Sequence, residues 1–243
     1  MNIKLFTIPN CITLLNLLCG MGSIVASLVY GDLTLAFIFV GASAVCDFLD
    51  GFSARLLKQY SEVGVQLDSL ADMVSFGVAP AVAMSVLCGE MPSVFGLNEL
   101  WAEILCYVPF LIAAFSALRL AKFNIDDTQH EEFCGLPTPA SAILCLSLAC
   151  VCERYDISFG MEWLLLISVL VAVLLVSPIR MFSLKFKGLS LRDKTNRLRY
   201  AFLLVAAAAL IIGGLGVLWG IIILYILASI ISTLACKSQT KEQ

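Results

Sequence analysis

The stretch "CDFLDGFSARLLKQYSEVGVQLDSLAD", residues 46–72, carries four aspartates inside a very apolar chain. Hydrophobic residues make up 60% of the 243 residues, and charged residues only 14%. A charged side chain at the centre of a bilayer costs ~2.5–3.5 kcal/mol on insertion scales. Four aspartates in one such segment therefore indicate a site that binds something of opposite charge.

The rest of the chain has the composition of an integral membrane protein, with a mean hydropathy of +0.98. Apolar stretches that approach the ~20 residues of a spanning helix are predicted as helices, because backbone polar groups must be satisfied within the bilayer. Eight such stretches occur: residues 11–30, 33–54, 66–88, 102–121, 138–152, 162–182, 199–214 and 217–236. The predicted fold is an all-α, polytopic helical bundle.

We expect one membrane domain over residues 1–243, with a six-helix core to about residue 182 and then a basic loop and two C-terminal spans. With eight spans, fourteen of the fifteen basic residues fall on the side of the termini, and only Arg154 falls on the other. Lys and Arg favour cytoplasmic loops. Both termini and the aspartate segment are therefore predicted to face the cytoplasm, in a membrane of the bacterial inner-membrane type.

The spacing of the aspartates places them in two pairs. Asp47 and Asp50 are three residues apart near the end of one predicted span, and Asp68 and Asp72 are four apart at the start of the next. Each spacing puts a pair on one helix face, and a short turn between antiparallel helices brings the pairs together. Carboxylate oxygens at this density suit Mg²⁺ or Mn²⁺. A solvated helix end and a proton or ion pathway are the alternative interpretations.

Small residues accompany these acids. Gly51 and Ala54 share the helix side of the first pair, and Gly64 precedes Asp68 by one turn. They leave room for a bulky ligand to approach the backbone. The planar guanidinium of Arg55 is suited to a phosphate group.

Together these residues follow the pattern D-x2-D-G-x2-A-R-x8-G-x3-D-x3-D at every position, and the segment resembles the CDP-alcohol phosphatidyltransferase family. The resemblance implies transfer of a phosphatidyl group from a CDP-linked lipid to an alcohol, with release of CMP. It also implies two metal ions per active site and a homodimer. The metal ligands it implies are Asp47, Asp50, Asp68 and Asp72, with Asp72 also as the base. The CDP-binding residues it implies are Asp47, Asp50, Gly51, Ala54, Arg55, Gly64 and Asp68.

Four further segments resemble the membrane-bound phosphatidylserine synthases of this family. They are "IPNCITLLNLLCG" from Ile8, "RLAKFN" from Arg119, "GLPTPASA" from Gly135 and "SPIRMFSLKFK" from Ser177. The resemblance implies CDP-diacylglycerol as the donor and L-serine as the acceptor. The same chemistry with another alcohol, such as glycerol 3-phosphate, and a cation or proton-coupled transporter are the alternatives.

A serine site needs a cation for the carboxylate and acceptors for the ammonium group. Candidate residues for serine or the lipid phosphate are Arg119, Lys122, Asn124, Thr138, Ser141 and Arg180. Positive-inside anchoring is the competing explanation for Arg119 and Lys122. Membrane lipid is an expected partner, and nucleic acid is not.

Overall fold

The computed structural model describes residues 5–125, 135–179, 181 and 214–239, and within these ranges the chain is helical and has no β-strand. The predicted all-helical class is confirmed for this part of the chain. The α-helices are α1 (Ile8–Val25), α2 (Leu33–Leu57), α3 (Glu62–Asp72), α4 (Ala79–Glu90), α5 (Glu99–Leu105), α6 (Phe110–Ile125), α7 (Thr138–Arg154), α8 (Met161–Val176) and α10 (Leu218–Gln239). Two π-helical segments, η1 (Ala26–Tyr30) and η2 (Met73–Val78), and the 3-10 turn η3 (Gly214–Val217) complete the described elements.

Several of these helices join into runs that match the predicted spans. By length and composition, four runs can cross a membrane: Ile8–Tyr30, Leu33–Leu57, Glu62–Glu90 and Glu99–Ile125. The apolar helices Met161–Val176 and Leu218–Ile230 are shorter. Nearly all of the predicted span 199–214 lies outside the described residues. The count of eight spans and their orientation stay predictions.

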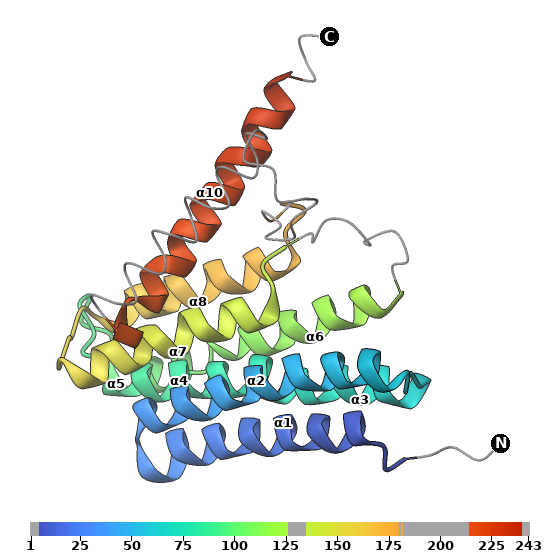
Figure 1. Ribbon diagram of the computed structural model, residues 1–243. Helices are drawn as coiled ribbons and strands as arrows, with labels where there is room; N and C mark the ends of the chain where they lie inside the picture. Colours follow the sequence, from blue (N-terminus) through green and yellow to red (C-terminus); the bar gives the residue numbers. More distant parts are fainter. Residues whose placement is uncertain (1–4, 126–134, 180, 182–213, 240–243) are drawn as a thin grey trace.

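Consecutive long helices run antiparallel and lie side by side (Figure 1). Helix α1 packs against α2, α3 and η2, while α7 contacts α2, α4 and α10. As a result, the start of α1, the end of α2, the start of α3 and the end of α6 meet at one end of the bundle (Figure 1). Helix α10 contacts α7 near its own start and then leans away from the other helices (Figure 1).

The turn between α2 and α3 brings the two aspartate pairs face to face. Lys58 ends α2 in the left-handed conformation at φ 53°, and the N–H of Gln59 donates to the carbonyl of Ala54 over 3.0 Å. This is a common way to close a helix C-terminus. Ser61 then caps α3, its Oγ accepting from the N–H of Gly64 at 3.0 Å. Only Lys58–Ser61 separate the two helices, so the chain reverses sharply.

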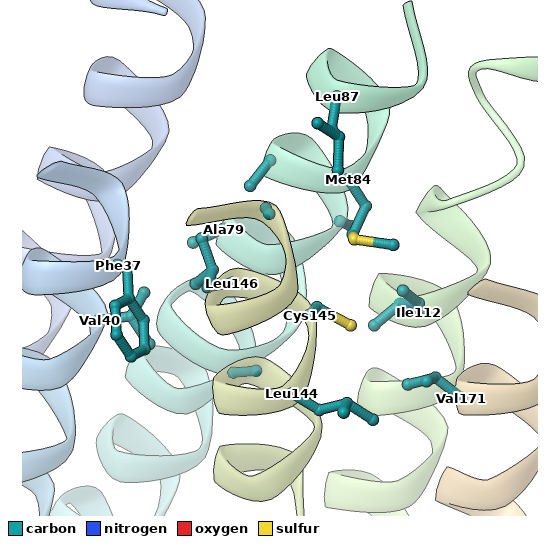
Figure 2. Packing of buried hydrophobic residues seen from close by; sticks show 14 of the residues in the cluster. Phe37, Val40, Ala79, Met84, Leu87, Ile112, Leu144, Cys145, Leu146 and Val171 are labelled. Atoms are coloured by element: carbon teal, nitrogen blue, oxygen red, sulfur yellow. The ribbon is translucent and has the colours of Figure 1, made fainter. Parts of the chain in front are cut away.

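The core lies between α2, α4, α6 and α7. Figure 2 shows Phe37 and Val40 of α2, Met84 of α4, Ile112 of α6 and Cys145 of α7 among the packed side chains. Many of the other buried residues are alanines, which let helices approach closely in a membrane. Large apolar side chains on the outer faces are exposed, as expected where helices contact lipid.

Candidate active site

Three of the four predicted aspartates converge at the α2–α3 end of the bundle. Asp47, Asp50 and Asp68 each offer a carboxylate oxygen, and these oxygens all lie within 4.8 Å of one another. Asp50 is buried, and Oδ1 of Asp68 is buried and has no hydrogen-bond partner among the residues that the structure describes. A buried carboxylate needs a compensating charge. Oxygen donors alone, this close together, fit Mg²⁺ or Mn²⁺.

Asp72 lies one helical turn beyond Asp68, beside this group of three. Its Oδ1 accepts a hydrogen bond of 3.2 Å from Nδ2 of Asn16 in α1. Asp72 also lines a cavity together with Asp68. Its position therefore suits contact with a bound molecule, whereas its role as a fourth metal ligand stays a prediction.

The small residues of the motif border one cavity of about 180 Å³. Gly51, Ala54 and Gly64 line it with Asp50 and Asp68. At Gly64 a Cβ would lie 3.1 Å from Oδ1 of Asn10, so a side chain there would disturb the wall. We call this space the motif cavity. The remaining lining residues are Pro9, Asn10, Thr13, Gln59, Tyr60, Ser61 and Val65.

Arg55 stands apart from this wall. Its side chain is exposed, and its Nη1 lies 4.0 Å from the position of a Cβ on Gly51. The guanidinium is therefore near the glycine but does not line the motif cavity in the described part of the chain. Contact with a phosphate of a bound ligand stays a prediction.

A second cavity, of about 280 Å³, shares Val65 and Asp68 with the first. We call it the α6–α7 cavity. Arg119 and Asn124 of α6 line it together with Asp72 and Thr138. Nη1 of Arg119 donates to Oγ1 of Thr138 at 3.3 Å, and its Nε is buried with no hydrogen-bond partner in the described part of the chain. The cavity thus combines a cation, hydroxyl and amide groups, and two carboxylates.

Other predicted acceptor residues lie outside this cavity. Lys122 lines a neighbouring cavity of about 250 Å³ between α6 and α8, where it is joined by Arg119. The hydroxyl of Ser141 is buried and donates to the carbonyl of Thr138 at 2.8 Å. Arg180 lies outside the described residues.

Helix α1 contributes polar residues that the motif analysis did not assign to the site. Asn10, Thr13 and Asn16 are spaced three residues apart and are all buried. Oγ1 of Thr13 donates to Oδ2 of Asp50 at 2.6 Å, and Asn16 contacts Asp72 as described above. Polar side chains in a membrane helix face the bundle interior. Their regular spacing within an apolar span is therefore a signal that the sequence already contained.

The family of the chain follows from a comparison with known proteins. The sequence profile described as CDP-alcohol phosphatidyltransferase matches residues 6–176. The chain belongs to this family. The match covers α1 through α8, and so includes the aspartates and the helices around both cavities. It favours a transferase over a transporter.

Three similar members of this family are named CDP-diacylglycerol–serine O-phosphatidyltransferase. The Bacillus subtilis (strain 168) protein is 39% identical over 140 residues, covering 57% of this chain and 72% of that protein. The Mycobacterium tuberculosis (strain H37Rv) protein is 32% identical over 232 residues, covering 92% and 77%. The Helicobacter pylori (strain 26695) protein is 35% identical over 180 residues, covering 72% of each chain.

Proposed function

We propose that the protein transfers the phosphatidyl group of CDP-diacylglycerol to the hydroxyl of L-serine, which yields phosphatidylserine and CMP. The observation that carries this proposal is the pair of cavities that meet at Asp68, one bordered by the family motif and the other by Arg119 and Asp72. The names of the relatives support serine as the acceptor.

The motif cavity suits the cytidine diphosphate part of the donor. The small side chains of Gly51, Ala54 and Gly64 leave space in it for the ligand. Two Mg²⁺ or Mn²⁺ ions would be held by Asp47, Asp50 and Asp68, with Asp72 as a further ligand. Such ions neutralise charge on a pyrophosphate and on the departing CMP. Arg55, exposed near Gly51, is the candidate contact for a phosphate oxygen.

The α6–α7 cavity suits the acceptor. The guanidinium of Arg119 can pair with the serine carboxylate, while Asn124 and Thr138 offer hydrogen bonds. Asp72 borders the same space and takes the proton of the serine hydroxyl as that oxygen attacks phosphorus. Lys122 and Arg180 are candidates for binding the lipid phosphate. Ser141 supports the position of Thr138 through the hydrogen bond from its hydroxyl to the Thr138 carbonyl.

At the level of the whole protein we propose a homodimer, each chain a single eight-span domain of the bacterial inner membrane. The distribution of basic residues supports cytoplasmic termini and an active site that opens to the cytoplasm. The lipid tails of the donor then stay in the bilayer, and only the headgroup region enters the cavities.

An acceptor panel tests this function. Purified protein with CDP-diacylglycerol and Mn²⁺ receives L-serine, glycerol 3-phosphate, inositol or no alcohol, and CMP and the lipid product are measured. We expect CMP release that depends on serine and a product with the mass of phosphatidylserine. Release with another alcohol and not with serine would refute the assigned acceptor, and no release with any alcohol would refute the transferase.

A further inference from the structure

We propose that Asn16 of α1 is a positioning residue that fixes the orientation of the Asp72 carboxylate toward the α6–α7 cavity. The proposal rests on the proposed function, in which Asp72 accepts the proton of the acceptor alcohol. Nδ2 of Asn16 donates to Oδ1 of Asp72 at 3.2 Å. Asn16 has no exposed surface, so it acts on the reaction only through Asp72.

The contacts around Asn16 hold its amide in one orientation. An asparagine amide has an accepting oxygen and a donating nitrogen on opposite sides. The hydroxyl of Ser43 in α2 contacts Oδ1 of Asn16, and the NH₂ group faces Asp72. The reverse orientation would place Oδ1 against the oxygens of a carboxylate, where no proton lies between them.

The backbone of Asn16 is held as well. Its carbonyl oxygen accepts from Oγ of Ser75 in η2 at 3.1 Å, and Oγ of Ser43 lies at the same distance. The π-helical segment η2 begins directly after Asp72 and carries Ser75. Asn16 is therefore anchored by the two helical runs that also carry the aspartates, and Asp72 cannot rotate without losing this contact.

In this arrangement the two carboxylate oxygens of Asp72 have different roles. Oδ1 accepts from the amide, and the side chain lines the α6–α7 cavity, so Oδ2 is the oxygen that we assign to the acceptor hydroxyl, and a metal contact would share Oδ1. A hydrogen bond to an ionised group is stronger and more directional than one between neutral groups. The two oxygens of a free carboxylate are equivalent. Asn16 thus holds the Asp72 carboxylate in one orientation, with Oδ2 toward the acceptor.

Asn16→Leu tests the proposal because it keeps the side-chain size and removes the donor. We expect the kcat of CMP release to fall about 10- to 100-fold, the range of one hydrogen bond to a charged group. The KM for serine and the affinity for CDP-diacylglycerol in Mn²⁺ should change less than threefold. Ser23→Ala is the matched control and should leave kcat unchanged. Ser23 is buried on the same helix, and its hydroxyl has no hydrogen-bond partner among the described residues.

A double-mutant cycle separates positioning from packing, because residues that act as a unit are not additive. In the Asp72→Asn background, Asn16→Leu should change the remaining kcat less than twofold. An equal loss in both backgrounds would overturn the proposal. So would a kcat loss accompanied by a matching loss of substrate affinity.

If Asn16→Leu does not fold, Ser43→Ala replaces it in the same cycle. This variant removes the hydroxyl that contacts the side-chain amide of Asn16, so the amide is less well fixed and kcat should fall about threefold or more. An unchanged kcat in Ser43→Ala would then overturn the proposal. If the wild-type protein prefers another alcohol, the cycle is run with that alcohol. The function would then be wrong while Asn16 is still tested.

Discussion

Asp68 lies where the two cavities meet, and its buried Oδ1 has no hydrogen-bond partner within residues 5–125, 135–179, 181 and 214–239. Leaving a carboxylate oxygen in this state is costly unless a cation compensates it. The neighbouring oxygens of Asp47 and Asp50 increase the repulsion. A bound pyrophosphate would add further negative charge to the same place. We therefore expect the proposed reaction to need divalent ions for binding the donor as well as for the chemical step.

We therefore expect chelation to abolish binding of the nucleotide. Titration calorimetry with CDP-diacylglycerol should show binding in Mn²⁺ or Mg²⁺, none after exhaustive treatment with EDTA, and recovery when the ion is restored. Equal affinity before and after removal of the ions would show that the aspartates hold no metal needed for the donor.

Arg119 is expected to recognise the acceptor, because its guanidinium lines the cavity that Asp72 also borders. A charge-assisted hydrogen bond is worth ~1.5–3 kcal/mol, so Arg119→Ala should raise the serine KM about tenfold or more. Lys122→Ala is the comparison and should raise that KM less, since Lys122 lines the neighbouring cavity and is absent from the described lining of the α6–α7 cavity. An unchanged serine KM with weaker donor binding in Arg119→Ala would move this arginine to the lipid phosphate.

Asp72→Asn keeps the shape of the side chain and removes most of its basicity. Positioned general-base catalysis contributes ~10²–10⁴-fold, and kcat should fall by about that factor. Measuring donor affinity against Mn²⁺ concentration in the variant separates two roles: a base alone leaves the metal requirement unchanged, whereas a ligand shifts it upward. Turnover near that of the wild-type protein would pass the base role to another aspartate.

At the scale of elements, the crossing of α1 with η2 decides how close the aspartates come to α1. At Gly20 a Cβ would lie 2.7 Å from Cα of Ser75, a distance that backbone atoms do not tolerate. The glycine therefore lets the two helices touch one turn beyond Asn16. The contacts of Asn16 with Ser75 and Asp72 depend on that close approach.

Gly20→Ala should therefore destabilise the fold. Overpacking of this kind costs ~1–3 kcal/mol, which should appear as a Tm several degrees lower in detergent. Gly41→Ala is the control, because Gly41 lies inside α2 with nothing within 4 Å of its Cβ position. There the better helix propensity of alanine should leave the Tm equal or slightly higher. Equal Tm values for the two variants would mean that α1 and η2 move apart at Gly20 without a loss of stability.

The sequence predicted the membrane-spanning helices, but it did not predict the π-helical segments within them. The apolar stretch 66–88 lies within the helical run Glu62–Glu90, because hydropathy follows the bilayer. The π-helical segment η2 inside that run, which contacts α1 and α6, was not predicted, because hydropathy does not distinguish a π-helical turn from an α-helical one. The convergence of Asp47, Asp50 and Asp68 could be predicted from the charge of their segment and the spacing of the aspartates. Asn16 was missed because its role depends on which face of α1 meets α3.

At the scale of the whole molecule, charge differs between the two ends of the bundle. At the end away from the aspartates, carboxylates cap helix and loop N–H groups. Glu153 accepts from the N–H groups of Leu33 and Thr34 at 2.8 and 2.9 Å, and Glu162 accepts from those of Val94 and Phe95 at 3.0 and 3.1 Å. These acids serve the fold. The basic residues, apart from Arg154, belong to the predicted side of the active site.

This asymmetry predicts on which side of the membrane the reaction occurs. EDTA does not cross a bilayer, so it reaches the aspartates only from the side to which their cavities open. In inverted inner-membrane vesicles, which expose the cytoplasmic face, added EDTA should stop serine-dependent CMP release at once. Right-side-out vesicles loaded with serine and Mn²⁺ should continue to make phosphatidylserine in the same EDTA, until detergent opens them. Immediate inhibition of the right-side-out vesicles, with the inverted ones unaffected, would reverse the proposed topology.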